Sequence, residues 1–338
     1  MTERCLVLDF CGARLRVAAP NEEWIDRFRR YFPAFVVAED ARRDSDFELR
    51  LCESASPKSS HDLPLTTEGI QNDGFFGRVF ENDRMIVLEV DGGGVTAIDH
   101  VKRRADVVVR PGTYPEFFGT AVIVVIDATL AAAGQQLTHG ASLIEPRSGR
   151  AVLVVAASGG GKTTTSLALA HAGFQLMTDD ASVLIPGAPR PRVWGLPRAL
   201  KVHRHTAEML NWLGPLADRW DKNQEQGIPT ASLADRIAVA PVAPIELGAI
   251  MLLGPRSELG HRVEPMSKGE LLVALAHDNV AWRRSGMTPK ALRRFEVFAR
   301  AVAQVPAFRI SAGSDLAQFP ELVSAVMSPG GGSKSVDP

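Results

Sequence analysis

The stretch that decides the fold, residues 151–163, reads Ala-Val-Leu-Val-Val-Ala-Ala-Ser-Gly-Gly-Gly-Lys-Thr. Its first five residues, Ala151–Val155, form a continuous apolar run, which predicts a strand covered on both faces. A glycine-rich turn follows, and then Thr163–His171 favours a helix that Gly173 ends. Phe174–Met177 predicts the next strand. Strand, loop, helix and strand make an α/β unit, so we expect an α/β domain here.

The glycine-rich turn fits the phosphate-binding pattern G-x-x-x-x-G-K-[ST], with Ala156 in place of the first glycine. Small residues let consecutive backbone N–H groups converge on phosphate oxygens, and the helix that begins near Lys162 points its positive end at them. Lys162 can reach the β and γ oxygens, and the Thr163 hydroxyl can complete Mg²⁺ coordination. The predicted nucleotide-binding residues are Ser158, Gly159, Gly160, Gly161, Lys162, Thr163 and Thr164.

A pair of acids, Asp179 and Asp180, follows the next predicted strand. Adjacent carboxylates repel each other unless cations or protons balance them, and Mg²⁺ together with a hydroxyl proton would do so. In an extended chain the two side chains diverge, so one would hold the metal while the other receives a proton. The alternative is a surface turn or a helix cap. His139, just before the predicted strand Ala141–Ile144, could contact phosphate or tune a carboxylate, or be purely structural.

A basic segment follows, with Arg198, Lys201, His203 and Arg204. Cations of this kind can hold a transferring phosphoryl group or an acidic substrate, although a solvated charged face is an equal alternative. Arg198 and Lys201 are the candidate substrate-binding residues. We expect the Arg283-Arg284 pair after Trp282 to lie on the surface.

The first part of the chain predicts strands with one helix. The helix is capped by Asn21 and places its aromatic residues on one face. The predicted strands are Leu6–Phe10, Arg14–Val17, Phe47–Leu51, Met85–Val90, Val95–His100 and Asp106–Arg110. Phe117–Ala133 is apolar, but it is slightly short for a bilayer and carries Asp127, so a buried helix is expected.

Three segments are polar or rich in turn-forming residues. We expect Ser54–Asn72 to be an exposed loop, Asp218–Thr230 to be mobile and the tail Ser328–Pro338 to be disordered.

Composition excludes several classes of function. Lys and Arg number 38 against 39 Asp and Glu, a balance that gives no support to a general nucleic-acid or anionic-membrane binder. The three cysteines have no C-x-x-C spacing, which favours reduced thiols over disulfides or zinc. No secretion signal is evident at the N-terminus, so a cytoplasmic protein is expected.

The ordered set of His139-Gly140, Ser158–Thr163 and Asp179-Asp180 resembles HPr kinase/phosphorylase and its relatives, which share the phosphoenolpyruvate-carboxykinase type of nucleotide-binding domain. The resemblance covers about residues 137–205, including the segment Gly195–Lys201. It implies that Lys162 and the loop amides bind the nucleotide phosphates. It further implies that Thr163 and Asp180 serve Mg²⁺ and that Asp179 is the base, with His139 nearby; the two acids could exchange roles.

The fold prediction is therefore α/β (α+β overall), with an HPr kinase-like P-loop domain behind a smaller strand-rich domain. The predicted segments are an N-terminal domain at 1–112, a connecting buried helix at 113–136, a kinase domain at 137–327 and a tail at 328–338. The predicted activity is ATP- (or GTP-) and Mg²⁺-dependent phosphorylation of a serine-type hydroxyl on a peptide or protein, such as a precursor peptide. A small-molecule kinase and a non-catalytic nucleotide-sensing subunit are the alternatives, and a homo-oligomer is compatible with the resemblance.

Overall fold

The computed structural model divides the chain into two compact units, Met1–Gln135 (unit 1) and Gln136–Pro338 (unit 2). The predictions for Ser158, for 282–284 and for the tail lie outside the described residues. The structure describes residues 4–37, 45–70, 76–157, 159–257, 260–280, 287–313, 316 and 318–327. Both units combine sheets with helices, so the protein is α+β overall.

Unit 1 is built on an eight-stranded sheet with the order β1-β2-β3-β8-β7-β6-β5-β4. Its strands are β1 Arg4–Phe10, β2 Ala13–Ala19, β3 Phe47–Glu53, β4 Leu65–Ile70, β5 Phe76–Glu81, β6 Met85–Val90, β7 Gly94–Asp99 and β8 Arg104–Val109. The pairs β2–β3 and β3–β8 are parallel and the other pairs are antiparallel. Alternate residues of β2, β3 and β8 are buried, as expected of a sheet with one covered face.

The helices of unit 1 are α1 Glu22–Tyr31 and α2 Tyr114–Ala132, with a short 3₁₀ helix, η1, at Pro33–Phe35. Asn21 caps α1 as predicted, because its Oδ1 accepts a hydrogen bond from the Trp24 amide at 3.2 Å. The predicted buried helix is α2, which packs against strands of unit 1 and belongs to that unit. Among the described residues, no helix has both the length and the apolar character that crossing a membrane requires.

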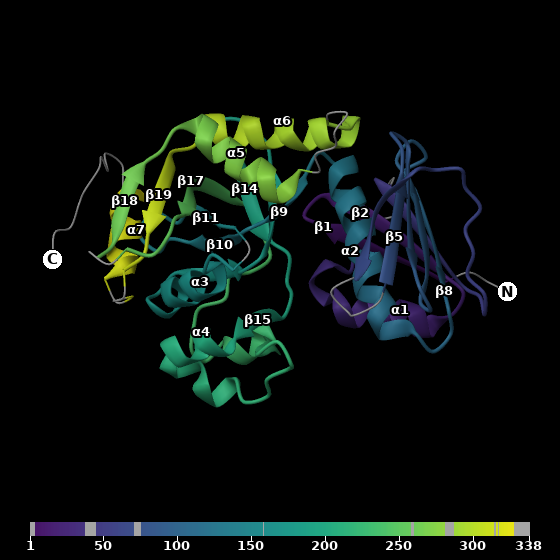
Figure 1. Ribbon diagram of the computed structural model, residues 1–338, viewed down its shortest axis with the longest axis horizontal. Coiled ribbons are helices and arrows are strands. Elements are labelled where there is room, and N and C mark those ends of the chain that lie inside the picture. The colour runs from purple at the N-terminus through teal and green to yellow at the C-terminus, as the bar shows by residue number, and fades with distance from the viewer. Residues whose placement is uncertain are drawn as a thin grey trace. The chain divides into compact units, whose positions relative to one another are not determined.

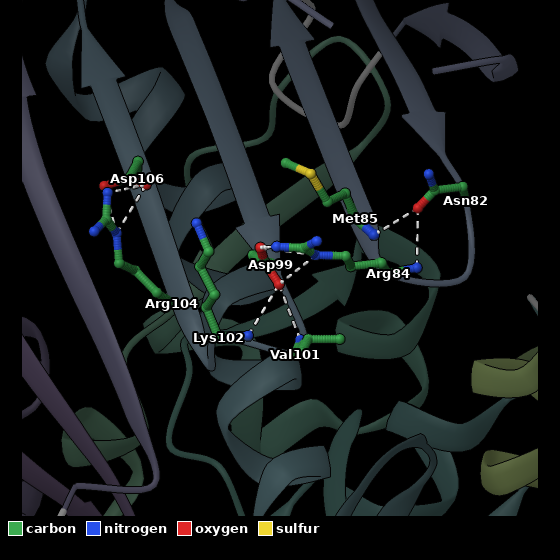
Figure 2. Close-up of polar contacts among 8 residues, drawn as sticks. All are labelled: Asn82, Arg84, Met85, Asp99, Val101, Lys102, Arg104 and Asp106. Atoms are coloured by element: carbon green, nitrogen blue, oxygen red, sulfur yellow. Dashed lines mark hydrogen bonds and ion pairs between the residues drawn. The ribbon is translucent and has the colours of Figure 1, made fainter. Parts of the chain in front are cut away.

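A turn in unit 1 is organised around a nearly buried acid, Asp99 (Figure 2). Its carboxylate accepts a hydrogen bond from Arg84 Nη2 at 2.7 Å. It also accepts hydrogen bonds from the amides of Val101 and Lys102, at 3.0 and 2.9 Å. The Arg84 hydrogen bonds, assisted by the two amides, lower the pKa of Asp99 to about 2. The charge is thus compensated where it is buried.

The sheets of unit 2 form around a long strand, β17. The strand order is β12-β10-β11-β17-β14-β13-β9, with β19 also paired to β17 and β18 paired to β19, and β15–β16 forms a separate hairpin. The strands are β9 Gln136–His139, β10 Ala141–Ile144, β11 Ala151–Val155, β12 Gln175–Thr178, β13 Ala181–Ile185, β14 Arg192–Gly195, β15 Leu200–His203, β16 Glu225–Ile228, β17 Ile245–Leu253, β18 Arg262–Pro265 and β19 Ala307–Ser311. The predicted strand 151–155 is β11, and all five of its residues are buried.

Helices cover both sides of the strands of unit 2, with α3 on one side and α5 and α6 on the other (Figure 1). The α-helices are α3 Lys162–His171, α4 Arg204–Met209, α5 Lys268–Asn279, α6 Pro289–Gln304 and α7 Phe319–Met327; the 3₁₀ helices are η3 Asn211–Leu216 and η4 Thr230–Leu233. Gly173 ends α3 as predicted, since it has a φ of +103° and donates its N–H to Ala170 O at 3.1 Å.

Two segments expected to lack regular structure contain strands instead. Residues 65–70 of the expected loop form β4, which pairs with β5, and residues 225–228 of the expected mobile segment form β16, which pairs with β15. Neither strand has a strong apolar alternation, so its formation depends on a partner strand that local sequence does not reveal. The three cysteines are free as predicted; Cys5 and Cys11 are partly buried, and Cys52 is exposed.

Candidate functional site

The connection between β11 and α3, residues 156–161, is the glycine-rich loop. Gly159 and Gly161 have φ values of +74° and +90°, a region that favours glycine. Gly160 is required for space, because a Cβ there would lie 2.9 Å from Ala157 O. Ala156 is buried and its φ is not positive, so the structure accepts the methyl group that replaces the first glycine of the pattern.

The N-terminus of α3 offers amides to whatever lies in front of it. Gly161 is the N-cap residue and supplies no side-chain cap. The first four N–H groups of an α-helix have no carbonyl partner within the helix, and they carry the positive end of its dipole. The first turn of α3 therefore offers backbone donors that suit an anion.

Lys162 is a buried cation at the first position of α3, with a residue exposure of 7%. Its Nζ donates a hydrogen bond to Ala156 O at 2.8 Å. Burial lowers the pKa of the ammonium, while the charges of Asp180, Asp278 and Asp179 act in the opposite direction. Since an ammonium has three protons, Ala156 O leaves donors available for a further acceptor.

Asp179 and Asp180 form the two-residue connection between β12 and β13, so the acids follow a strand as predicted. Asp179 is 4% exposed and accepts a hydrogen bond from Thr163 Oγ1 at 3.0 Å. Burial raises its pKa to about 6 and the neighbouring charge of Asp180 adds to the rise, while the Thr163 bond opposes it. The hydroxyl expected to serve Mg²⁺ thus meets Asp179, and not Asp180.

Asp180 has different neighbours. Its Oδ1 lies 3.2 Å from His139 Nε2 and its Oδ2 lies 3.9 Å from Arg198 Nη1. All three side chains are about half exposed, so a second substrate can reach them. The antiparallel pairing of β9 with β13 sets His139 opposite Ala181, and Gly140 N donates to Asp180 O at 2.9 Å. The predicted histidine is therefore beside the predicted acids.

Gly195 brings the end of β14 against the end of β12. A Cβ on Gly195 would lie 2.3 Å from Met177 O, so the backbones meet where only glycine fits. Leu196 N then donates to Ala181 O at 2.9 Å. This close approach places the segment that carries Arg198 next to the connection that carries the two acids.

Lys201, the other predicted substrate-binding residue, is engaged elsewhere. It lies on the exposed side of β15 and its Nζ is 3.1 Å from Glu225 Oε2, a residue that also pairs with His203. The hydroxyl of Thr164 is likewise turned away, because its Oγ1 lies 2.8 Å from Thr206 Oγ1 on α4. Thr164 can contribute its backbone amide to the loop site.

The sequence reading missed the C-terminal turn of α5. Asn279 Oδ1 accepts a hydrogen bond from His139 N at 2.7 Å, and Asp278 acts electrostatically on Lys162. These residues lie about 120–140 positions from their partners and belong to no motif. A helix C-terminus with two polar residues gives no local signal of such a role.

A polar cavity of about 410 Å³ lies in unit 1, and its lining includes no residue that was predicted to be functional. Its charged lining residues are Lys58, Arg78, Glu89, Asp91 and Arg110. Arg78 is paired with Asp91 at 3.0 Å and with Glu89 at 3.5 Å, so part of this charge is internally satisfied. Beside the glycine-rich loop, Lys162 and Asp179 are both buried and both have shifted pKa values, so the loop is the stronger candidate site.

Comparison of the chain with models of known protein families gives no match, and a search among curated proteins gives none either.

Proposed function

We propose that the protein is a Mg²⁺-dependent kinase that transfers the γ-phosphoryl group of ATP or GTP to a serine-type hydroxyl on a peptide or protein. One observation carries the proposal: the two adjacent acids are divided between two environments. Asp179 is buried against Thr163, and Asp180 is half exposed beside His139 and Arg198. One carboxylate is thus placed for a metal and the other for an acceptor.

The glycine-rich loop supports the nucleotide part of the proposal. Gly159–Gly161 keep the loop free of side chains, and the uncapped start of α3 supplies amides for phosphate oxygens. Lys162 supplies a buried ammonium whose remaining protons can meet the β and γ oxygens. Charge neutralisation and positioning of this kind make up most of the catalysis in phosphoryl transfer.

Thr163 and Asp179 are the residues that would hold Mg²⁺. A hydroxyl and a carboxylate, completed by phosphate oxygens and waters, form the usual protein-side ligand set of this ion. Bound Mg²⁺ would supply neutralisation of the charge that develops on the phosphate oxygens. A cation here would also balance the Asp179 charge, which burial now disfavours. This assignment is the exchanged version of the one that the family resemblance suggested first.

Asp180 would act as the base. The acceptor oxygen attacks the γ phosphorus, the bond from that phosphorus to the β–γ bridging oxygen breaks, and the acceptor proton passes to the Asp180 carboxylate. His139, at 3.2 Å, orients this carboxylate, and Arg198 adds positive charge for the transferring group. The products are the phosphorylated hydroxyl and the nucleoside diphosphate. A nucleotide-sensing subunit, in which bound ATP would order the segment Asp218–Thr230, is less well supported, because that segment already contains β16.

The test is phosphoryl transfer by wild type, Lys162→Ala and Lys222→Ala, using γ-labelled ATP or GTP and separate peptide and metabolite pools. Lys162→Ala should lower transfer about 10²–10³-fold, as expected for the loss of one preorganised charge. Lys222 is exposed, so Lys222→Ala should match wild type. The thermal unfolding midpoints report whether each variant is folded. An unchanged rate in folded Lys162→Ala would refute the mechanism, and label in the metabolite pool alone would select the small-molecule alternative.

A further inference from the structure

The C-terminal turn of α5 contacts the strand that carries His139. Asn279 is the last residue of α5, and its Oδ1 accepts the His139 N–H at 2.7 Å. Its Nδ2 donates to Leu275 O at 2.9 Å, so both ends of the amide have a partner and its orientation is defined. The Asn279 side chain therefore links α5 to β9 in a defined orientation.

Asn279 is also held by a second helix, α6. Arg294 Nη1, on α6, donates to Asn279 O at 3.0 Å, and α5 and α6 pack together. The last carbonyls of a helix have no partner within it, and a guanidinium at this end also suits the helix dipole. Asn279 is thus fixed through its main chain as well as its side chain.

The contact has a clear structural purpose at the edge of a sheet. β9 is the terminal strand in the strand order, so within the part of the chain that the structure describes one of its two edges has no neighbouring strand. The N–H of His139 finds a side-chain acceptor in Asn279 instead of a strand. Fixing this backbone also fixes the point from which the imidazole reaches Asp180, at 3.2 Å. A backbone that could move here would loosen the pair.

We propose that Asn279 is a positioning residue for the phosphoryl transfer proposed above: through the backbone of His139 it holds the imidazole against Asp180. The inference rests on the proposed function, because Asp180 is there the base. The same helix turn also brings Asp278 close enough to act on the charge of Lys162. The end of α5 therefore belongs to the site through Asn279, which contacts His139, and Asp278, which acts on Lys162.

The experiment is a double-mutant cycle between Asn279 and His139, read as kcat and KM for the nucleotide. Asn279→Leu removes the acceptor at similar volume, and it should lower kcat about 10–30-fold with KM within about twofold, because the loop and Lys162 are untouched. In a His139→Ala background the same change should have less than a twofold effect, since no imidazole remains to be placed. Asn223→Leu, at an exposed asparagine of the same unit, is the matched control.

A merely structural role would give a different pattern. It would lower kcat by the same factor with and without the His139 side chain, and that result would overturn the proposal, as would an unchanged kcat in Asn279→Leu. Asn279→Asp keeps the acceptor oxygen and should retain kcat within about threefold. If the leucine variant does not fold, Asn279→Ala removes the same acceptor in a good helix former. A wild type without Mg²⁺- and nucleotide-dependent transfer would show that the proposed function itself fails, and the positioning role with it.

Discussion

Two acids with little exposed surface, Asp99 in unit 1 and Asp179 in unit 2, have opposite pKa shifts. Asp99 receives a guanidinium and two amides, and its pKa falls to about 2. Asp179 accepts one side-chain hydrogen bond, from the Thr163 hydroxyl, and has Asp180 as its neighbour, and its pKa rises to about 6. Desolvation by burial is the largest cause of the rise at Asp179, whereas at Asp99 the hydrogen bonds from Arg84 outweigh desolvation. A buried carboxylate without a compensating cation lowers the stability of the fold, and groups with such perturbed pKa values cluster at functional sites.

The same contrast extends to the cations. On the open face of the sheet in unit 1, arginines meet acids, as in Arg16–Glu48 at 2.6 Å and Arg104–Asp106 at 2.8 Å. Lys162 is buried instead against a backbone carbonyl, and burial lowers its pKa. In these pairs of unit 1 the charges satisfy each other, while Lys162 and Asp179 of unit 2 are groups whose charges a bound anion and cation would satisfy.

The largest expected effect comes from removing the uncompensated acid. Asp179→Asn keeps an acceptor for Thr163 and should lower phosphoryl transfer about 10²–10³-fold, while the fold becomes more stable at high pH. The folded-state pKa of Asp179, about 6, lies above the ordinary value of 3.8, so the carboxylate destabilises the fold increasingly as pH rises between these values. The stability gain of the variant should be about 2–3 kcal/mol larger at pH 8 than at pH 3.5.

Urea unfolding of wild type and Asp179→Asn at the two pH values measures this difference directly. Equal stability differences at pH 3.5 and pH 8 would mean that Asp179 is not held at a cost, and the contrast with Asp99 would collapse.

The next effect tests the backbone approach that assembles the site. Gly195→Ala places a methyl group 2.3 Å from Met177 O, so the ends of β12 and β14 must separate, at a cost of about 2–3 kcal/mol in the free energy of unfolding. Gly269→Ala is the matched control, because a Cβ there meets nothing within 4 Å in α5 and should be neutral or stabilising. Equal unfolding midpoints for the two variants would contradict the assigned role of Gly195.

Local patterns were enough to predict the loop and its place in the fold. The apolar run 151–155, the three glycines and the start of α3 all follow from periodicity and from the conformations that glycine permits. The position of Asp179 and Asp180 after a strand followed for the same reason. Each of these features is decided within about 30 residues of chain.

The different partners of Asp179 and Asp180 could not be predicted in this way. Which of them meets Thr163 depends on how β12 ends and turns into β13, and the strand alternation alone allows either answer. The ion pair of Lys201 with Glu225 could not be predicted for a similar reason, since it depends on the pairing of β15 with β16. Asn279 was missed because its contact with His139 spans 140 residues and needs the tertiary structure.

The smallest expected effect completes the comparison from the side of unit 1. Asp99→Asn removes the charge that pairs with Arg84 but leaves an acceptor for the amides of Val101 and Lys102, so the loss should be about 1–2 kcal/mol at pH 7. The folded-state pKa of about 2 lies below 3.8, so the stabilisation is complete above about pH 4 and fades as pH falls through 2. Asp106→Asn is the control, because Asp106 is more exposed than Asp99, and an ion pair that is close to half exposed contributes little (Figure 2). Urea unfolding at pH 7 and pH 2.5 should therefore show a clear, pH-dependent loss for Asp99→Asn and a smaller one for Asp106→Asn; equal losses would mean that burial does not distinguish the two acids.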